Sequence, residues 1–242
     1  MIFKYIDKKL LSILNRIDNK YNIKSSFDYY KSDNEGQDKQ TFLYLIKKLK
    51  KYTKLVTDIN IKGNHLDLGC GTGRYFIDSN KFKLYGLDPN KYMITHAKSK
   101  SIQLITDIQL VNGDLDRLML LYLSIKFNLI YYFGVFGEHT VLDRDTLWQL
   151  ISLLNQDGIL LLTIYTGGIR RSKTIKKVFT YISKILIFFN LSKSALFITR
   201  TFNINLLSQL EDLKLSIVEK QKLITNSISW SGSHLFLAIR KL

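Results

Sequence analysis

The chain has 242 residues and a formal net charge of +16, with 46% hydrophobic residues, 12% aromatic residues, one proline and one cysteine. This composition excludes a disordered chain, and the length suits one α/β domain with additions better than two independent domains. The single cysteine excludes an intramolecular disulfide, and no apolar run reaches the ~18 residues of a transmembrane helix, so we expect a cytoplasmic chain or one bound peripherally to a membrane.

Helical periodicity characterises the first quarter of the sequence. Apolar residues recur at intervals of three and four over residues 2–17, and a second pattern of this kind runs from Thr41 to Val56. The polar stretch 32–40 separates the two. Residues 1–58 are therefore predicted to form a helical cap that precedes the main domain.

From residue 59 to the end, short apolar runs alternate with amphipathic segments, which is the pattern of a βαβ succession with a parallel sheet. Helices are predicted between the strands at 89–100, 143–154 and 203–213, with Asp143 and Asn203 at N-cap positions. Seven strands are predicted, at 65–68, 83–87, 109–111, 127–133, 159–164, 215–219 and 235–240.

The segment 166–200 interrupts this alternation after the fifth predicted strand. It has eight basic residues and no acidic one, whereas residues 61–165 have ten of each. The periodicity predicts an extra helix over 173–190 with an apolar face and basic edges. Three roles stay open: a lid packed on its own domain, an interfacial helix that contacts an anionic membrane through 170–190, and a nucleic-acid contact. A lysine-rich coding bias would also raise the charge, but it would scatter it along the chain.

The strongest local signal is a short strand that runs directly into three alternating glycines, His65-Leu66-Asp67-Leu68-Gly69-Cys70-Gly71-Thr72-Gly73. Glycines permit positive φ and let a ligand approach the backbone, while the amides that follow can donate hydrogen bonds. The Gly-x-Gly-x-Gly spacing differs from that of dinucleotide folds and from the lysine-ended phosphate loop. A glycine turn can also be merely a tight connection between a strand and a helix. Asp67 directly before the turn favours a binding site instead.

The run from Asp67 to Gly73 resembles motif I of class I S-adenosylmethionine-dependent methyltransferases, in particular their small-molecule branch of ubiquinone-biosynthesis and glycan-modifying enzymes. The resemblance is clear over residues 60–165 and weak elsewhere. It implies a Rossmann-like, doubly wound sheet of seven strands, mostly parallel with the last strand antiparallel. It also implies a domain over 59–242 with a lid insertion at 166–200, and S-adenosyl-L-methionine as the cofactor.

The same resemblance implies the residues that hold the cofactor. Asp88 lies about 20 residues beyond the first glycine, the interval at which an acidic side chain can accept hydrogen bonds from ribose hydroxyls. Asp114 resembles the residue that receives the adenine amino group, although an aspartate after glycine is also common in ordinary turns. The full predicted set is Asp67, Gly69, Cys70, Gly71, Gly73, Asp88, Asp114, Leu115 and Phe133.

Glu138 and His139 follow the fourth predicted strand, in the loop that faces the methyl acceptor in similar enzymes. A histidine with an ordinary pKa of ~6.5 can accept a proton from an acceptor hydroxyl, so His139 is the candidate base and Glu138 its neighbour. A loop histidine is also commonly solvated or structural. The histidines are isolated and there is no second cysteine, so no metal site is predicted. Neither a cysteine nucleophile for pyrimidine carbons nor an Asn-Pro-Pro-Tyr motif for adenine N6 is present.

These features predict methyl transfer to an oxygen or nitrogen of a small-molecule, lipid or glycan acceptor. An RNA methyltransferase is the alternative, and charge alone supports it because no RNA-binding module is recognisable. A non-catalytic protein that binds S-adenosylmethionine for regulation is an alternative of a different class.

Overall fold

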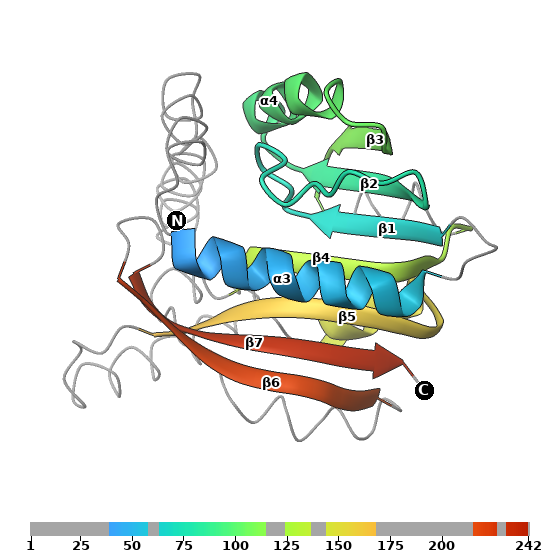
Figure 1. Cartoon of the computed structure of the whole chain (residues 1–242). Helices are drawn as coiled ribbons and strands as arrows, with labels where there is room; N and C mark the ends of the chain where they lie inside the picture. Colours follow the sequence, from blue (N-terminus) through green and yellow to red (C-terminus); the bar gives the residue numbers. More distant parts are fainter. Residues whose placement is uncertain are drawn as a thin grey trace, which may run out of the picture.

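The computed structural model describes residues 39–57, 63–114, 124–136, 144–167, 215–226 and 231–241. Within these ranges, one seven-stranded sheet is flanked by the helices α3, α4 and α6 (Figure 1). The helices predicted at 2–17, 173–190 and 203–213, and the lid beyond Gly167, lie outside the described residues.

The strand order is β3-β2-β1-β4-β5-β7-β6, and the order reverses beside β1. All pairs among β1 to β5 are parallel, and β7 is antiparallel to β5 and to β6. The predicted doubly wound, mostly parallel sheet is therefore confirmed, and the carboxyl ends of β1 to β5 share the edge at which ligands bind in such sheets. The strands are β1 (Gly63–Leu68), β2 (Phe82–Asp88), β3 (Asp107–Asn112), β4 (Phe127–Phe136), β5 (Leu154–Gly167), β6 (Leu215–Asn226) and β7 (Ser231–Lys241).

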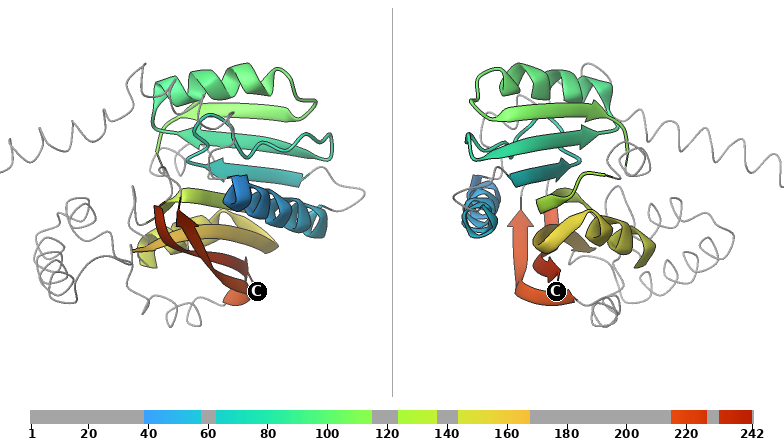
Figure 2. Two further views of the ribbon diagram at one scale, coloured as in Figure 1. Left: turned by 60° about the vertical axis from the view of Figure 1, so that its left-hand side comes forward. Right: turned by 90° about the vertical axis from the view of Figure 1, so that its right-hand side faces the viewer.

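Both faces of the sheet are apolar, because side chains alternate between the two faces along each buried strand. One face packs against α6 (Arg144–Ser152), and the other packs against α3 (Lys39–Val56) and α4 (Lys91–Ser101). Figure 2 shows α3 and α6 on opposite sides of the sheet. The central strands β1 and β2 are almost entirely buried, as a parallel sheet requires, whereas the edge strand β3 is largely exposed.

Helix α3 lies across β4 and β5 and belongs to the core of the sheet. Its buried side chains Leu45, Leu49 and Tyr52 recur at helical spacing and are fully covered. The helix predicted from Thr41 to Val56 is confirmed with a start at Lys39. The described part of the predicted cap therefore packs directly on the sheet.

Most strands extend beyond the predicted bounds, and the helix boundaries shift by one or two residues. Helix α6 ends at Ser152 rather than at residue 154, because Leu154 already pairs with Phe127 as the first residue of β5. Asp157 then adopts a left-handed conformation, with φ 61°, before regular pairing resumes. Helix α4 begins after Asn90, whose side chain accepts hydrogen bonds from the first backbone amides of the helix.

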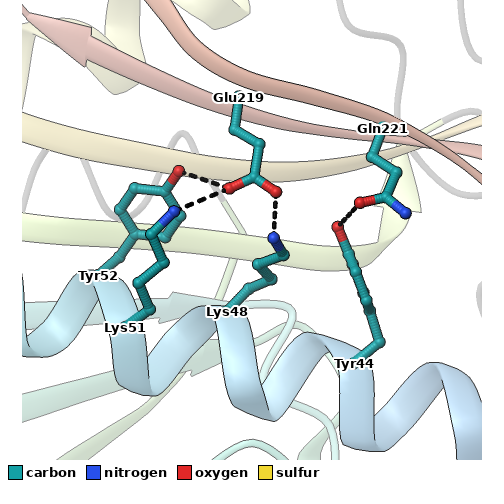
Figure 3. A network of polar contacts seen from close by, with 6 residues as sticks. All are labelled: Tyr44, Lys48, Lys51, Tyr52, Glu219 and Gln221. Atoms are coloured by element: carbon teal, nitrogen blue, oxygen red, sulfur yellow. Dashed lines mark hydrogen bonds and ion pairs between the residues drawn. The ribbon is translucent and has the colours of Figure 1, made fainter.

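A polar network joins α3 to the edge strand β6 (Figure 3). Glu219 accepts hydrogen bonds from Lys48, from Lys51 at 3.2 Å and from the Tyr52 hydroxyl at 2.9 Å. Beside it, the Tyr44 hydroxyl donates to Gln221 at 2.7 Å. Burial raises the pKa of Glu219, but the hydrogen bonds from the two lysines and the tyrosine outweigh it, so the pKa lies below its ordinary value.

A β-bulge in β6 makes this network possible. The pairing with β7 shifts between Ile217 and Glu219, and Val218 is the extra residue. Because side chains alternate along a strand, one extra residue reverses the faces of all that follow. Glu219 therefore lies opposite Ala238, on the face that α3 covers.

Candidate cofactor site

The glycine turn after β1 is held in a conformation that suits glycine. Gly69, Gly71 and Gly73 have φ of 63°, 54° and 78°, a region that other residues rarely adopt. The Cys70 amide donates to the Leu87 carbonyl at 3.0 Å, and the Gly73 amide donates to the Cys70 carbonyl at 2.9 Å. The turn is thus closed on itself and anchored to β2.

The glycines of the turn differ in the space around them. A Cβ atom on Gly73 would lie 2.6 Å from the Phe76 ring, so packing alone excludes a side chain there. A Cβ atom on Gly71 would meet no atom closer than the Gly69 carbonyl oxygen, at 4.0 Å. Open space beside exposed backbone is what a ligand that runs along the turn needs.

Asp88 ends β2 and connects the turn to α4. Its Oδ2 accepts a hydrogen bond from the Gly71 amide at 2.9 Å, and its Oδ1 accepts one from the Asn90 amide at 2.8 Å. The residue is 9% exposed, and burial raises its pKa to about 6 although both amides lower it. Each carboxylate oxygen retains acceptor capacity, so Asp88 can still accept hydrogen bonds from ligand hydroxyls.

Asp67 lies on β1 between Gly86 of β2 and Tyr131 of β4. It is 2% exposed, and its Oδ2 has no hydrogen-bond partner among the described residues. Burial raises the pKa of Asp67 well above its ordinary value and the charge of Asp88 adds to the rise, whereas a hydrogen bond with Tyr131 lowers it. Sequence reasoning did not single out Tyr131, because only the pairing of β1 with β4 brings it to Asp67.

Cys70 is buried beneath the turn, at 4% exposure. A Cβ atom on Gly86 would lie 2.5 Å from Leu110 Cδ2 and 3.2 Å from the Cys70 sulfur, so both side chains fill the space that Gly86 leaves. Burial raises the pKa of the Cys70 thiol well above its ordinary value. A neutral thiol in this position packs rather than reacts.

The end of β3 is fixed to the end of β2. The Asn112 side-chain amide donates to the Asp88 carbonyl at 3.0 Å and to the Pro89 carbonyl at 2.8 Å, and the Gly113 amide donates to the Asp88 carbonyl at 3.0 Å. The exposed Asp114 follows directly, at the same sheet edge as Asp88. Its role toward an adenine ring stays a prediction.

Phe133 belongs to an aromatic cluster at the end of β4. Its ring packs edge-on against Tyr75 at 5.1 Å, and Phe42 of α3 lies 5.7 Å from Tyr75 on the other side. At 5% exposure Phe133 is part of the core, and contact with a cofactor stays a prediction. The next residue, Gly134, has φ 74° and donates its amide to the Thr163 hydroxyl at 2.7 Å, a kink that the sequence did not predict.

Leu115, Glu138 and His139 lie outside the described residues. Within the described ranges, no group of three or more potential metal-binding side chains occurs. No helix in the described part of the chain is long and apolar enough to cross a membrane. Burial lowers the pKa values of His65 and His234 to about 3 and about 4.

Comparison with known proteins identifies the central part of the chain. Residues 66–158 match the family model of a methyltransferase domain. No curated sequence is significantly similar to the chain.

Three solved structures share the fold. Magnesium protoporphyrin IX methyltransferase from Synechocystis PCC 6803, with bound SAH, is 17% identical over 84% of this chain and 82% of its own, with a TM-score of 0.55. The CurJ carbon methyltransferase is 16% identical over 89% of this chain and 59% of its own, with a TM-score of 0.61. An S-adenosylmethionine-dependent methyltransferase from Clostridium acetobutylicum ATCC 824 is 14% identical over 91% of this chain and 99% of its own, with a TM-score of 0.53.

Residues 66–158 therefore match a methyltransferase domain, and the fold is that of S-adenosylmethionine-dependent methyltransferases of known structure. The matched segment contains the glycine turn, Asp88 and Asp114. The residues present fit S-adenosylmethionine, since the space beside Gly71 admits a ligand along the backbone. The buried acids Asp67 and Asp88 suit the positive charge and the hydroxyl groups of this cofactor.

Proposed function

We propose that the chain transfers the methyl group of S-adenosylmethionine to an oxygen or nitrogen of a small-molecule, lipid or glycan acceptor, with oxygen favoured. The observation that carries the proposal is the cradle of three positive-φ glycines with Asp88 fixed 2.9 Å from the Gly71 amide nitrogen. The resemblance of Asp67–Gly73 to the small-molecule branch supports this class of acceptor. Among the structural neighbours, magnesium protoporphyrin IX methyltransferase is named for a small-molecule acceptor.

Each part of the site has a distinct task in this proposal. The turn from Gly69 to Gly73 offers backbone to the amino-acid part of the cofactor, Asp88 accepts hydrogen bonds from the ribose, and Asp114 with Leu115 borders the adenine. When bound, S-adenosylmethionine supplies a methyl group on positively charged sulfur, which a nucleophilic oxygen or nitrogen can attack. The protein contributes alignment of the acceptor and exclusion of water.

The candidate base is His139, with Glu138 beside it. If His139 takes the acceptor proton, His139→Ala should lower turnover about 10²–10⁴-fold and leave S-adenosylmethionine affinity nearly unchanged. The matched control is His96→Ala on α4, which should keep both the turnover and the S-adenosylmethionine affinity of wild type. Loss of cofactor binding in His139→Ala, or no kinetic effect, would assign His139 a structural role.

The direct test incubates purified protein with methyl-labelled S-adenosylmethionine and a host extract, followed by separation of lipid, small-molecule, protein and RNA fractions. We expect label in the lipid or small-molecule fraction, and none with the Gly71→Val variant. Label in RNA would favour the RNA methyltransferase. Cofactor binding without transfer to any fraction would favour the non-catalytic regulatory protein.

We further propose that the acceptor is anionic or membrane-associated and that the chain works in the cytoplasm, in part at a membrane surface. The support is the concentration of eight basic and no acidic residues in 166–200. Replacement of five of them by glutamine should weaken sedimentation with anionic liposomes by about 1 kcal/mol each. Steeply salt-dependent RNA binding without liposome binding would contradict this part. The five positions are Arg170, Arg171, Lys173, Lys176 and Lys177.

A further inference from the structure

Asp67 is a buried acid whose Oδ2 atom lacks a hydrogen-bond partner among the described residues. Ionisation of such a group is unfavourable unless a positive charge or a donor compensates it. The charged and titratable groups that face Asp67 are Asp88 from β2, Cys70 from the turn, Tyr131 from β4 and Lys100 from α4. Another carboxyl group and one lysine leave the surroundings without an excess of positive charge.

The carboxyl group of Asp67, which lacks an excess of positive charge around it, lies next to the glycine turn. The residue pairs with Gly86 on one side and with Tyr131 on the other, so its neighbours in the sheet are fixed. Two residues further along the chain, where β1 has ended, Gly69 begins the turn and has no side chain. Asp67 therefore directly precedes the backbone along which a ligand would lie.

Tyr131 is the second member of the arrangement. It is 2% exposed, and its hydroxyl forms a hydrogen bond with the carboxyl group of Asp67. A hydroxyl that donates to the carboxylate favours the ionised form of Asp67 and fixes its orientation. The same residue contributes its ring to the core between β4 and α3.

We propose that Asp67 and Tyr131 form a charge-selective positioning pair, in which Asp67 ionises when a cationic cofactor binds at the glycine turn. The proposal rests on the proposed function, which supplies the ligand. On binding, the carboxyl group of Asp67 loses its proton to solvent, and the resulting carboxylate keeps the Tyr131 hydroxyl as its donor. S-adenosylmethionine carries a sulfonium charge that S-adenosylhomocysteine lacks, so the ionised pair favours the methyl donor over the spent product.

This pair predicts how cofactor binding depends on pH. Where one proton leaves on binding, affinity rises about tenfold per pH unit. The ratio of the affinities for S-adenosylmethionine and S-adenosylhomocysteine should therefore increase from pH 5 to pH 8. A role of Asp67 in packing alone would leave this ratio flat.

Calorimetry of the full chain at pH 7, in buffers that differ in ionisation enthalpy, counts the released protons. For wild type we expect net proton release with S-adenosylmethionine and less release with S-adenosylhomocysteine. Asp67→Asn should release none. Tyr131→Phe should bind S-adenosylmethionine about 10- to 100-fold more weakly and regain affinity at higher pH. Tyr85→Phe, a buried tyrosine in the cluster on the opposite face, is the matched control and should behave as wild type.

Binding of S-adenosylmethionine without proton release, or a Tyr131→Phe pH profile that coincides with that of wild type, would overturn the pair and leave the proposed function standing. Failure of wild type to bind S-adenosylmethionine would overturn both. If Tyr131→Phe does not fold, the affinity ratio of wild type across pH decides: a rising ratio supports the pair, and a flat ratio refutes it.

Discussion

Two carboxyl groups of this protein, Glu219 and Asp67, accept a tyrosine hydroxyl in opposite environments. Glu219 joins β6 to α3, with Lys48 and Lys51 as partners and a side chain that is 19% exposed. Asp67 lies beneath the glycine turn, almost fully buried and next to another acid. The lysines and tyrosine hold the pKa of Glu219 below its ordinary value, whereas burial raises that of Asp67.

The difference shows where the fold tolerates unfavourable electrostatics. The network on β6 is satisfied within the protein and strengthens the contact between α3 and the sheet edge. At the turn, burial and the neighbouring acid Asp88 raise the pKa of Asp67 although Lys100 lowers it, and such perturbed groups concentrate at sites that bind or react. Four variants test this contrast between the α3–β6 network and the glycine turn.

Gly71→Val should have the largest effect. A β-branched residue at φ 54° is strained, and its side chain would fill the open space beside the turn. We expect a loss of S-adenosylmethionine affinity of about 100-fold or more by calorimetry, with smaller loss in Gly71→Ala, which adds one methyl group. Wild-type affinity in both variants would show that the turn does not hold the cofactor.

Asp88→Ala should weaken S-adenosylmethionine binding by about 1–3 kcal/mol, the range for hydrogen bonds to a charged group. Asp114→Ala should lose less, because Asp114 is exposed. The matched control is Asp78→Ala, since Asp78 also accepts a backbone amide, from Ile105 at 2.7 Å, but does so before β3 and away from the turn. Equal binding by Asp88→Ala and wild type would move ribose recognition elsewhere.

Asp67→Asn should flatten the pH dependence of stability in the unliganded protein. A carboxyl group whose folded-state pKa is raised stays protonated in the fold while it ionises in the unfolded chain. Its contribution to stability is therefore present below the unfolded pKa of ~3.9 and is lost as pH rises toward the folded pKa. We expect wild type to lose about 1 kcal/mol or more of unfolding free energy between pH 4 and pH 8 through such groups, and Asp67→Asn to lose less. Urea unfolding at both pH values measures this, and equal losses would refute it.

Glu219→Gln should have the smallest effect, with the opposite pH dependence. Because the folded-state pKa of Glu219 is lowered, its contribution is present above the unfolded pKa of ~4.3 and is lost as pH falls through the folded pKa. We expect a loss of about 1 kcal/mol in unfolding free energy at pH 7 that disappears in acid. Asp107→Asn, which removes the exposed ion pair with Lys83 at 3.7 Å, is the control and should change stability less. If Glu219→Gln still lowers the unfolding free energy at pH 3, packing rather than charge accounts for the contribution of Glu219 to stability.

The sequence predicted the sheet and the turn because both are local patterns. Apolar alternation identified the strands, and the glycine spacing identified a turn that needs positive φ. Asp88, which the interval from Gly69 singled out, lies at the turn and accepts a hydrogen bond from the Gly71 amide, and its role toward the ribose stays a prediction.

Features that depend on lateral pairing were not predictable in the same way. In the sequence, Tyr131 is one of several apolar residues of a predicted strand. Only the pairing of β1 with β4 shows that it lies next to Asp67. The bulge at Val218 and the early start of β5 at Leu154 depend on how each strand pairs with its neighbour. One inserted residue changes which face a side chain occupies, and no local pattern reports the insertion.

The place of β7 between β5 and β6 has a consequence for synthesis of the chain. On the ribosome β6 emerges first, but its partner in the sheet is β7, which follows it in the sequence. Helix α3 meets Glu219 only then, across 171 residues of sequence between Lys48 and its partner. Contacts of such long range form slowly and late. We therefore expect the nascent chain to expose the edge of β5 that pairs with β7 until β7 has left the ribosome, and this interval is when it needs protection from aggregation.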